Sequence, residues 1–280
     1  MILCIDVGNT NIKYAVFDGK TLKASYRVSS RHTRTADEYG STLLNLLLSS
    51  NINRNDIDGI IMSSVIPSLN YTISHMCEYF FNISPFMIGA GIKTGLNIKA
   101  DNPKEVGADI IVNSVSAYKR YGDGNPMVVI DFGTATTFDI ISGNGELLGV
   151  VIAPGIKTSL EGLVSNTAQL PMIELEAPKS VIGKNTITCM QAGIIFGFAG
   201  IVENIIKKIK QELKVKDIAV IATGGMGEII AKEVSCITKI DRMLTLEGLR
   251  LIYEMNKGGN KSWRKKLKSV IYISVVAKGC

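Results

Sequence analysis

The 280-residue sequence contains few of the residues on which metal-dependent or cross-linked folds rely. It has 5 cysteines, 2 histidines and 1 tryptophan, and no two cysteines lie close enough together to form a C-x-x-C pair. This scarcity argues against a zinc ribbon, an iron–sulfur cluster and a disulfide framework. His32 and His75 have no cysteine or carboxylate partners at motif spacing, so we assign neither a catalytic role.

Long apolar runs are also missing. No uninterrupted run approaches the roughly 20 residues that a membrane-spanning helix requires. The chain enters an apolar strand pattern at Ile2, without a basic flank or a cleavage site, so we expect no signal peptide. These features predict a cytoplasmic protein with no membrane partner.

Most of the chain has no excess of charge of either sign. The formal net charge is +6, but residues 257–280 contain seven Lys or Arg and no Asp or Glu. The remainder is therefore close to neutral, and we expect no nucleic-acid partner for it. We interpret residues 257–280 as a flexible basic tail. Contact of this tail with a membrane surface or nucleic acid is the alternative.

Length and composition favour two lobes. With 46% hydrophobic and 20% charged residues, 280 residues can bury two medium cores. Apolar strand patterns and amphipathic helix patterns alternate in both halves, which predicts an α/β fold. We place the lobes at residues 1–120 and 121–256, followed by the tail.

One short pattern occurs twice. Asp6–Thr10 (DVGNT) and Asp131–Ala135 (DFGTA) each follow an apolar run. The run predicts a buried strand, and the glycine permits a tight turn whose backbone amides can approach an anion. Two such turns, each opening with a carboxylate, suit a nucleoside triphosphate and its metal held from both sides. The duplication therefore predicts a two-lobed phosphotransferase.

Start and stop signals predict the main helices at residues 36–49, 67–81, 156–166 and 186–213. A further helix is predicted from Pro103 to about Tyr121, with Asn102 as its cap and Glu105 three residues later. Residues 187–198 are apolar on most sides, which suits either a dimer interface or a core helix.

Six strings carry a resemblance to a known family: MILCIDVGNTNIK, DNPKEVGADIIVNSV, VVIDFGTATTFD, GVVIAPGI, VIGKNT and ATGG. In this order they resemble type III pantothenate kinases, from Met1 to about Asn256. The resemblance implies two ribonuclease H-like lobes around a central cleft, as in the superfamily of acetate and sugar kinases, heat-shock ATPases and actin. It also implies ATP-dependent phosphorylation of pantothenate, the first step towards coenzyme A, by a homodimer whose acceptor pocket is completed across the interface.

The resemblance also assigns nucleotide and cation sites. The residues expected to bind ATP are Asp6, Val7, Gly8, Asn9, Thr10, Asn11, Ile12, Lys13 and Thr134. The Asp6 carboxylate can hold Mg²⁺ through water, and the Lys13 ammonium can face phosphate oxygens. Asp131 is expected to bind a monovalent cation, K⁺ or NH₄⁺. Turn capping by both aspartates and a solvated Lys13 are the alternatives. Gly224 and Gly225 end a strand and would let the backbone pass close to the nucleotide.

The expected acceptor site lies in the strings DNPKEVGADIIVNSV and VIGKNT. By resemblance, pantothenate contacts Gly107, Ala108, Asp109, Ile110 and Thr186. Asp109 is the candidate base for the acceptor hydroxyl, and a favourable interaction with the helix dipole is the alternative explanation for it.

The chain departs from the family pattern at Ile110, where the family has Arg, and at Ala100, where it often has Tyr. These departures leave open another small hydroxyl substrate, or an ATP-binding accessory or regulatory protein. The sequence does not decide between them.

Overall fold

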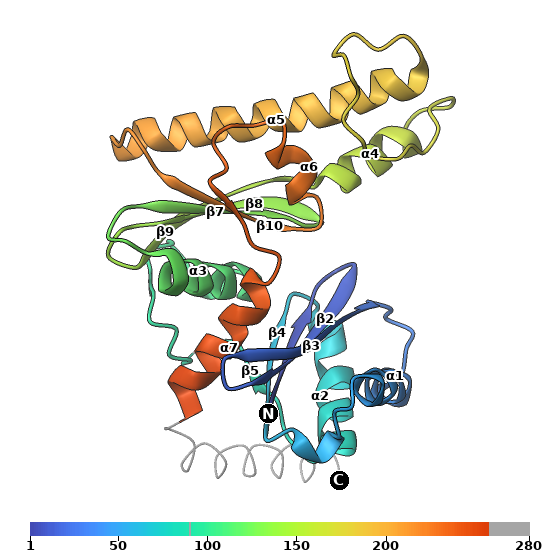
Figure 1. Ribbon diagram of the computed structural model, residues 1–280, viewed down its shortest axis with the longest axis vertical. Helices are drawn as coiled ribbons and strands as arrows, with labels where there is room; N and C mark the ends of the chain where they lie inside the picture. The colour runs from blue at the N-terminus through green and yellow to red at the C-terminus, as the bar shows by residue number, and fades with distance from the viewer. Residues whose placement is uncertain (90, 258–280) are drawn as a thin grey trace, which may run out of the picture.

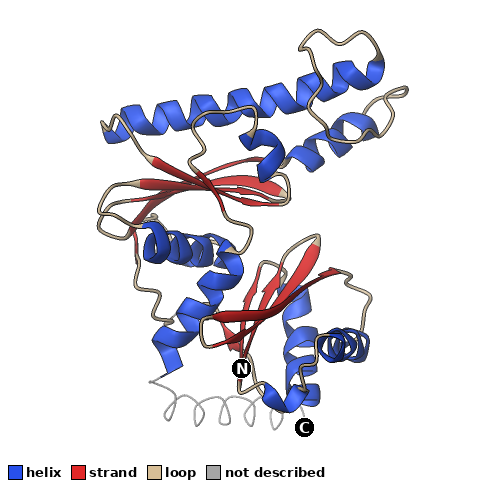
Figure 2. Ribbon diagram, in the orientation of Figure 1, coloured by secondary structure: helices blue, strands red, loops and turns tan. Residues whose placement is uncertain are grey.

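Two mixed β-sheets form the framework of the protein (Figures 1 and 2). The computed structural model describes residues 1–89 and 91–257. In spatial order, the first sheet consists of β3 (Thr21–Ser29), β2 (Asn11–Asp18), β1 (Ile2–Val7), β4 (Gly59–Ser64) and β5 (Phe86–Met87). The second sheet consists of β11 (Lys239–Ile240), β10 (Ala219–Gly224), β7 (Met127–Phe132), β8 (Ala135–Ile141), β9 (Glu146–Pro154) and β6 (Asn97–Ile98).

The two sheets repeat one topology, apart from the additional edge strand β6. In the first, β1 is antiparallel to β2 and parallel to β4; in the second, β7 is antiparallel to β8 and parallel to β10. The second turn is one residue shorter, because Asp6 lies opposite Lys13, seven residues later, whereas Asp131 lies opposite Thr137, six residues later. The predicted duplication and the two-lobed α/β fold are therefore confirmed.

Helices cover both sheets and fill the space between them (Figure 1). They are α1 (Ala36–Ser49), α2 (Pro67–Phe81), α3 (Ala108–Tyr121), α4 (Ile156–Ser165), α5 (Thr186–Leu213), α6 (Gly227–Ala231) and α7 (Leu244–Asn256), with 3₁₀ turns η1 (Arg54–Asp56) and η2 (Pro103–Glu105). Helices α1 and α2 pack on one face of the first sheet, and α5 and α6 pack on the outer face of the second. Helices α3 and α7 lie between the sheets.

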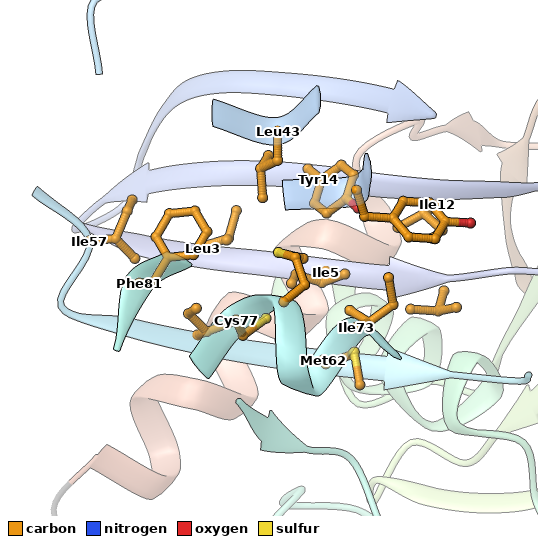
Figure 3. Packing of buried hydrophobic residues seen from close by; sticks show 14 of the residues in the cluster. Leu3, Ile5, Ile12, Tyr14, Leu43, Ile57, Met62, Ile73, Cys77 and Phe81 are labelled. Atoms are coloured by element: carbon orange, nitrogen blue, oxygen red, sulfur yellow. The ribbon is translucent and has the colours of Figure 1, made fainter. Parts of the chain in front are cut away.

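The core of the first lobe illustrates how this packing arises (Figure 3). Alternate residues of β1, including Leu3 and Ile5, meet Ile73 and Cys77 from α2. Because side chains alternate across a strand and recur every three or four residues along a helix, one face of each element is apolar. All four side chains are fully buried, so the strand that leads to the first turn is held firmly.

Helix α7 follows the second sheet in the chain but packs against the first. Its residues Leu246, Leu249 and Ile252 join a buried cluster with Cys4 and Phe17 of β1 and β2. Helix α3 contributes to the clusters of both sheets. The proposed lobe boundary at residue 120 falls in the last turn of α3, before β7, and stays a prediction.

The predicted start of the central helix is wrong. Asn102 caps only the 3₁₀ turn Pro103–Glu105, and α3 begins at Ala108. Val106 and Gly107 have extended backbones, with ψ of 124° and 143°, which interrupt the helical hydrogen bonds. Asp109 therefore lies in the first turn of α3, where backbone N–H groups have no acceptor within the helix.

The remaining helix predictions agree with the structure to within one residue. Helix α5 has the length and apolar composition that would allow a membrane span, as core helices of soluble proteins also can. One of its faces packs on the second sheet through Ile195, Phe198 and Val202. The predicted tail, apart from Lys257, lies outside the described residues.

Candidate active site

The two acid-led turns meet where the lobes face each other. The Thr10 and Thr134 hydroxyl oxygens are 3.1 Å apart, across 124 residues of sequence. Each turn is closed by a backbone hydrogen bond, from Gly8 N–H to the Asn11 carbonyl and from Gly133 N–H to the Ala135 carbonyl. The structure thus brings the duplicated turns together, as the sequence predicts for a shared polyphosphate.

The first carboxylate is held on both sides. Asp6 Oδ1 accepts a hydrogen bond from Ser63 Oγ at 2.8 Å, and Asp6 Oδ2 lies 3.2 Å from Lys13 Nζ. Burial alone would lower the pKa of Lys13, but the charges of Asp6 and then Asp131 outweigh it and raise the pKa. Lys13 therefore stays cationic, as a phosphate contact requires.

The second carboxylate is held from helix α3. Asp131 Oδ2 accepts a hydrogen bond from Asn113 Nδ2 at 3.1 Å. Asp131 Oδ1 lies over Gly224, which has a φ of +90° and where an added Cβ would be only 2.6 Å away. Burial raises the pKa of Asp131 to about 6, because the opposing attraction of Lys13 is countered by repulsion from Asp109 and Asp6.

Asp109 completes the cluster at the start of α3. Its Oδ1 accepts a hydrogen bond from the Ile110 N–H at 2.9 Å. Burial raises the pKa of Asp109; the Ile110 N–H opposes this, and the negative charge of Asp6 adds to it. A carboxylate with a raised pKa is a better proton acceptor near neutral pH than a free aspartate. The mutual effects of Asp6, Asp109, Asp131 and Lys13 show that one electrostatic cluster includes all four.

The other expected residues differ in where they lie. Val7, Ile12 and Ile110 are buried among apolar side chains, so a ligand can reach only their backbone atoms. Gly107 and Ala108 lead directly into Asp109. Thr186 is exposed at the start of α5, which Figure 1 shows on the far side of the second sheet from α3. Within one chain, Thr186 is therefore apart from the cluster.

The donors present suit a metal–nucleotide complex better than a preformed metal cage. In the described part of the chain, no group of three or more His, Cys, Asp or Glu side chains is arranged to hold a metal ion. Mg²⁺ commonly keeps its waters and binds through one or two carboxylates plus phosphates. Both oxygens of Asp6 have protein partners, which fits contact with Mg²⁺ through water. Among the described residues, Asp131 has a hydrogen-bond donor on only one oxygen, so its other oxygen would suit direct contact with a larger monovalent cation.

Comparison with known proteins decides the family. The sequence model of type III pantothenate kinases matches residues 2–208. This chain belongs to the type III pantothenate kinase family. A type III pantothenate kinase from Moorella thermoacetica is 49% identical over 256 residues, which cover 91% of this chain and all of the relative.

Solved structures support the fold of this type III pantothenate kinase family member. A Baf family transcriptional activator from Campylobacter jejuni superposes with a TM-score of 0.59 and 18% identity, covering 91% of this chain and 99% of the other. A 2-dehydro-3-deoxygalactonokinase from Sinorhizobium meliloti superposes with a TM-score of 0.58 and 10% identity, covering 91% and 96%. At these identities the likeness concerns the fold alone.

Sequence reasoning missed several polar residues around the cluster. Asn113 and Ser63 are almost fully buried and donate to the two hairpin aspartates. Asp139 on β8 is fully buried, and neither carboxylate oxygen has a hydrogen-bond partner among the described residues. Burial, then the charges of Asp131 and Asp109, raise the pKa of Asp139 well above its usual value. A polar residue inside an otherwise apolar helix face or strand was the available signal.

Proposed function

We propose that this kinase transfers the γ-phosphoryl group of ATP to the terminal hydroxyl of pantothenate, giving 4′-phosphopantothenate and ADP. The contact between the two acid-led turns carries this proposal, because it supplies a two-sided phosphate site. Family membership supports pantothenate as the acceptor. A cytoplasmic location is part of the proposal, since the reaction consumes ATP.

We assign ATP binding to the first acid-led turn and to Thr134 of the second. Phosphate oxygens would bind the amides of Asn9 to Asn11, the Lys13 ammonium and the Thr134 hydroxyl, while the Gly8 N–H closes the turn by donating to the Asn11 carbonyl. Mg²⁺ near Asp6 and a monovalent cation, K⁺ or NH₄⁺, at Asp131 would neutralise phosphate charge when bound. The protein itself holds Lys13 charged and keeps the two turns in contact, so that the polyphosphate is positioned before transfer.

Asp109 handles the proton. The acceptor oxygen forms a bond to the γ-phosphorus while the bond from that phosphorus to the bridging oxygen of ADP breaks. The proton of the acceptor hydroxyl passes to an Asp109 carboxylate oxygen. Because a loose phosphoryl transfer releases this proton late, a carboxylate that orients the hydroxyl is sufficient.

The acceptor pocket requires a second copy of the chain, which is the second part of the proposal. The outer face of α5 leaves Gly193, Gly197 and Gly200 exposed, and a Cβ added at each would meet no atom. Ile187 and Ile201 on the same helix are 51% and 36% exposed. Small residues let two helices approach closely, and a homodimer through α5 would bring the partner's Thr186 to the pocket that lies apart from it in one chain.

The altered acceptor side calls for a substrate panel as the test. Ile110 packs into the core of the second sheet, so it cannot replace the donor that an arginine would supply. ADP release by the purified protein is measured with pantothenate, with other small hydroxyl compounds, and with no acceptor, each with and without K⁺. We expect stimulation by pantothenate that increases with K⁺. Stimulation by another compound alone would overturn the acceptor, and ATP binding without turnover would indicate an accessory protein.

A further inference from the structure

We propose that Asn113 and Thr245 are positioning residues, which orient the Asp131 carboxylate and link it to helix α7. This inference rests on the proposed function, because it assigns the cation and phosphate side of that site. None of the sequence patterns described above points to Thr245.

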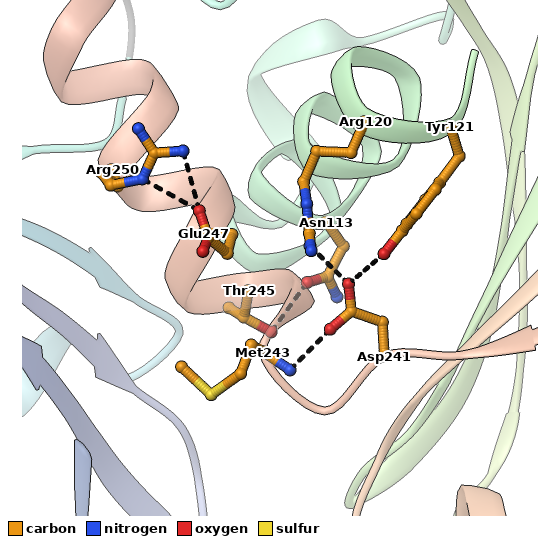
Figure 4. A network of polar contacts seen from close by, with 8 residues as sticks. All are labelled: Asn113, Arg120, Tyr121, Asp241, Met243, Thr245, Glu247 and Arg250. Atoms are coloured by element: carbon orange, nitrogen blue, oxygen red, sulfur yellow. Dashed lines mark hydrogen bonds and ion pairs between the residues drawn. The ribbon is translucent and has the colours of Figure 1, made fainter. Parts of the chain in front are cut away.

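The contacts form a buried chain. Thr245 Oγ1 donates to Asn113 Oδ1 at 2.8 Å, and Asn113 Nδ2 donates to Asp131 Oδ2 at 3.1 Å. Figure 4 shows Thr245 of α7 directed at Asn113 of α3. Thr245 and Asn113 are 3% and 1% exposed, so water does not compete for these groups. This pair of hydrogen bonds connects the consecutive elements α3 and β7 to α7, across 132 residues of sequence between Asn113 and Thr245.

The direction of each hydrogen bond fixes the Asn113 amide. An asparagine side chain carries an acceptor and a donor that exchange places when the amide rotates. An ionised Asp131 accepts only, so it requires the Asn113 NH₂ group, and Thr245 supplies the hydroxyl that the Asn113 carbonyl then needs. Without the Thr245 hydroxyl, the buried Asn113 carbonyl has no donor. Rotation of the Asn113 amide, which would turn this carbonyl towards Asp131, then becomes less unfavourable.

Fixing Asn113 also fixes Asp131. One oxygen of that carboxylate is held by Asn113, and the other lies directly above Gly224. The carboxylate therefore has a defined plane, which decides where its free lone pairs point. Partners one step removed from a ligating group commonly change metal affinity or activity by about 10- to 100-fold.

The start of α7 is itself anchored, so Thr245 has a fixed position. Asp241 in the loop before α7 accepts hydrogen bonds from Tyr121 Oη at 2.6 Å and from Met243 N–H at 2.9 Å. Asp241 also forms an ion pair with Arg120, the residue before Tyr121 at the end of α3 (Figure 4). The middle of α3 is thus tied to the first turn of α7 through Asn113, and its C-terminal end is tied to the loop before α7 through Asp241.

The test replaces the Thr245 hydroxyl without changing its volume. Thr245→Val removes the donor, and Thr245→Ser keeps it. Thr136→Val is the matched control, because Thr136 is equally buried in the hairpin strand β8 and its hydroxyl has no hydrogen-bond partner among the described residues. For each purified protein, the melting temperature is measured alone, with a nonhydrolysable ATP analogue and Mg²⁺, and with the same ligands across a KCl titration. ADP release with pantothenate is measured in parallel.

We expect Thr245→Val to weaken the ligand-dependent stabilisation, with a loss of apparent K⁺ and nucleotide affinity of about tenfold. Thr245→Ser should stay within about threefold of the wild type, and Thr136→Val should retain the full ligand response. A merely structural Thr245 would lower the melting temperature without changing the ligand response, which would overturn the proposal. An equal loss in Thr136→Val would overturn it too.

A double-mutant cycle tests whether Thr245 acts through Asn113. If it does, adding Thr245→Val to Asn113→Ala should cause little further loss of ligand response. Additive losses would contradict the link. Failure of the wild-type protein to bind nucleotide or to turn over would instead count against the proposed function, so the two failures can be told apart.

Discussion

The first and second hairpins share a topology and differ in charge. Asp6 lies opposite Lys13, whereas Asp131 lies opposite Thr137. Two residues earlier on the leading strand, Cys4 is paired with Ala15, whereas Val129 is paired with Asp139. The first hairpin therefore pairs its carboxylate with a cation, and the second adds a buried acid. In the function we propose, one duplicated framework thus serves phosphate at the first hairpin and a cation at the second.

Asp109, at the second position of α3, is the acid of the site that belongs to neither hairpin. We expect Asp109→Asn to lower kcat by about 10²- to 10⁴-fold while nucleotide affinity stays unchanged, because the amide cannot accept the hydroxyl proton. Asp37→Asn is the control, since Asp37 is likewise second in its helix. ADP release and binding of an ATP analogue measure the two effects. An equal loss in Asp37→Asn, or near-normal turnover by Asp109→Asn, would favour the helix-dipole explanation.

Lys13→Thr would give the first hairpin the residue of the second. We expect ATP affinity to fall about 10- to 100-fold, because hydrogen bonds to charged groups contribute about 1.5–3 kcal/mol. Lys23→Thr on the neighbouring strand β3 removes an exposed lysine and should leave affinity unchanged. Isothermal titration with the ATP analogue measures both. Comparable affinities for the two variants would mean that Lys13 is only a solvated lysine.

Gly224 and Ser64 occupy equivalent positions beside the two hairpins, opposite Phe132 and Val7. Only Gly224 has a positive φ and lies against the hairpin carboxylate. Gly224→Ala should lower the free energy of unfolding by about 1–3 kcal/mol through backbone strain. Gly225→Ala should be neutral, because an added Cβ there meets no atom. Urea denaturation compares them, and equal stabilities would show that Asp131 does not require the glycine.

Asp139→Asn should remove from the second hairpin a buried ionisable group that the first hairpin lacks, since Ala15 occupies the equivalent position there. The folded pKa of Asp139 is raised, so the folded state binds more protons than the unfolded state above a pH of about 4. Stability is therefore lost as pH rises through that range. The variant should be more stable by about 1–2 kcal/mol at pH 7 and no more stable at pH 4. Thermal melts at both pH values decide this, and a pH-independent difference would contradict it.

Local signals predicted the duplicated framework well. An apolar run followed by an acid and a glycine specifies a strand and a tight turn within ten residues, so both hairpins could be placed. The false helix start at Pro103 shows the limit of such signals, because Asn102 and Glu105 serve a 3₁₀ turn as well as an α-helix.

Contacts across the fold could not be predicted in the same way. Ser63 and Thr245 reach the site from elements 57 and 132 residues away from their partners Asp6 and Asn113. Their roles depend on strand register and on how α7 packs, neither of which a single motif encodes. Asp139 could have been noticed from the sequence, because an acid between Phe138 and Ile140 is unusual in a buried strand.

Helix α7 follows the second sheet in sequence but packs on the first, and this affects how the newly synthesised chain folds. One face of the first sheet, with Cys4 and Phe17, is covered in part by α3 and stays incompletely covered until residues 244–256 have been synthesised. The amino-terminal portion therefore cannot reach its final state on the ribosome ahead of the rest, as independent units do. A premature stop anywhere before α7 would release a chain whose earliest strands expose an adhesive surface, making it a target for chaperones and proteases.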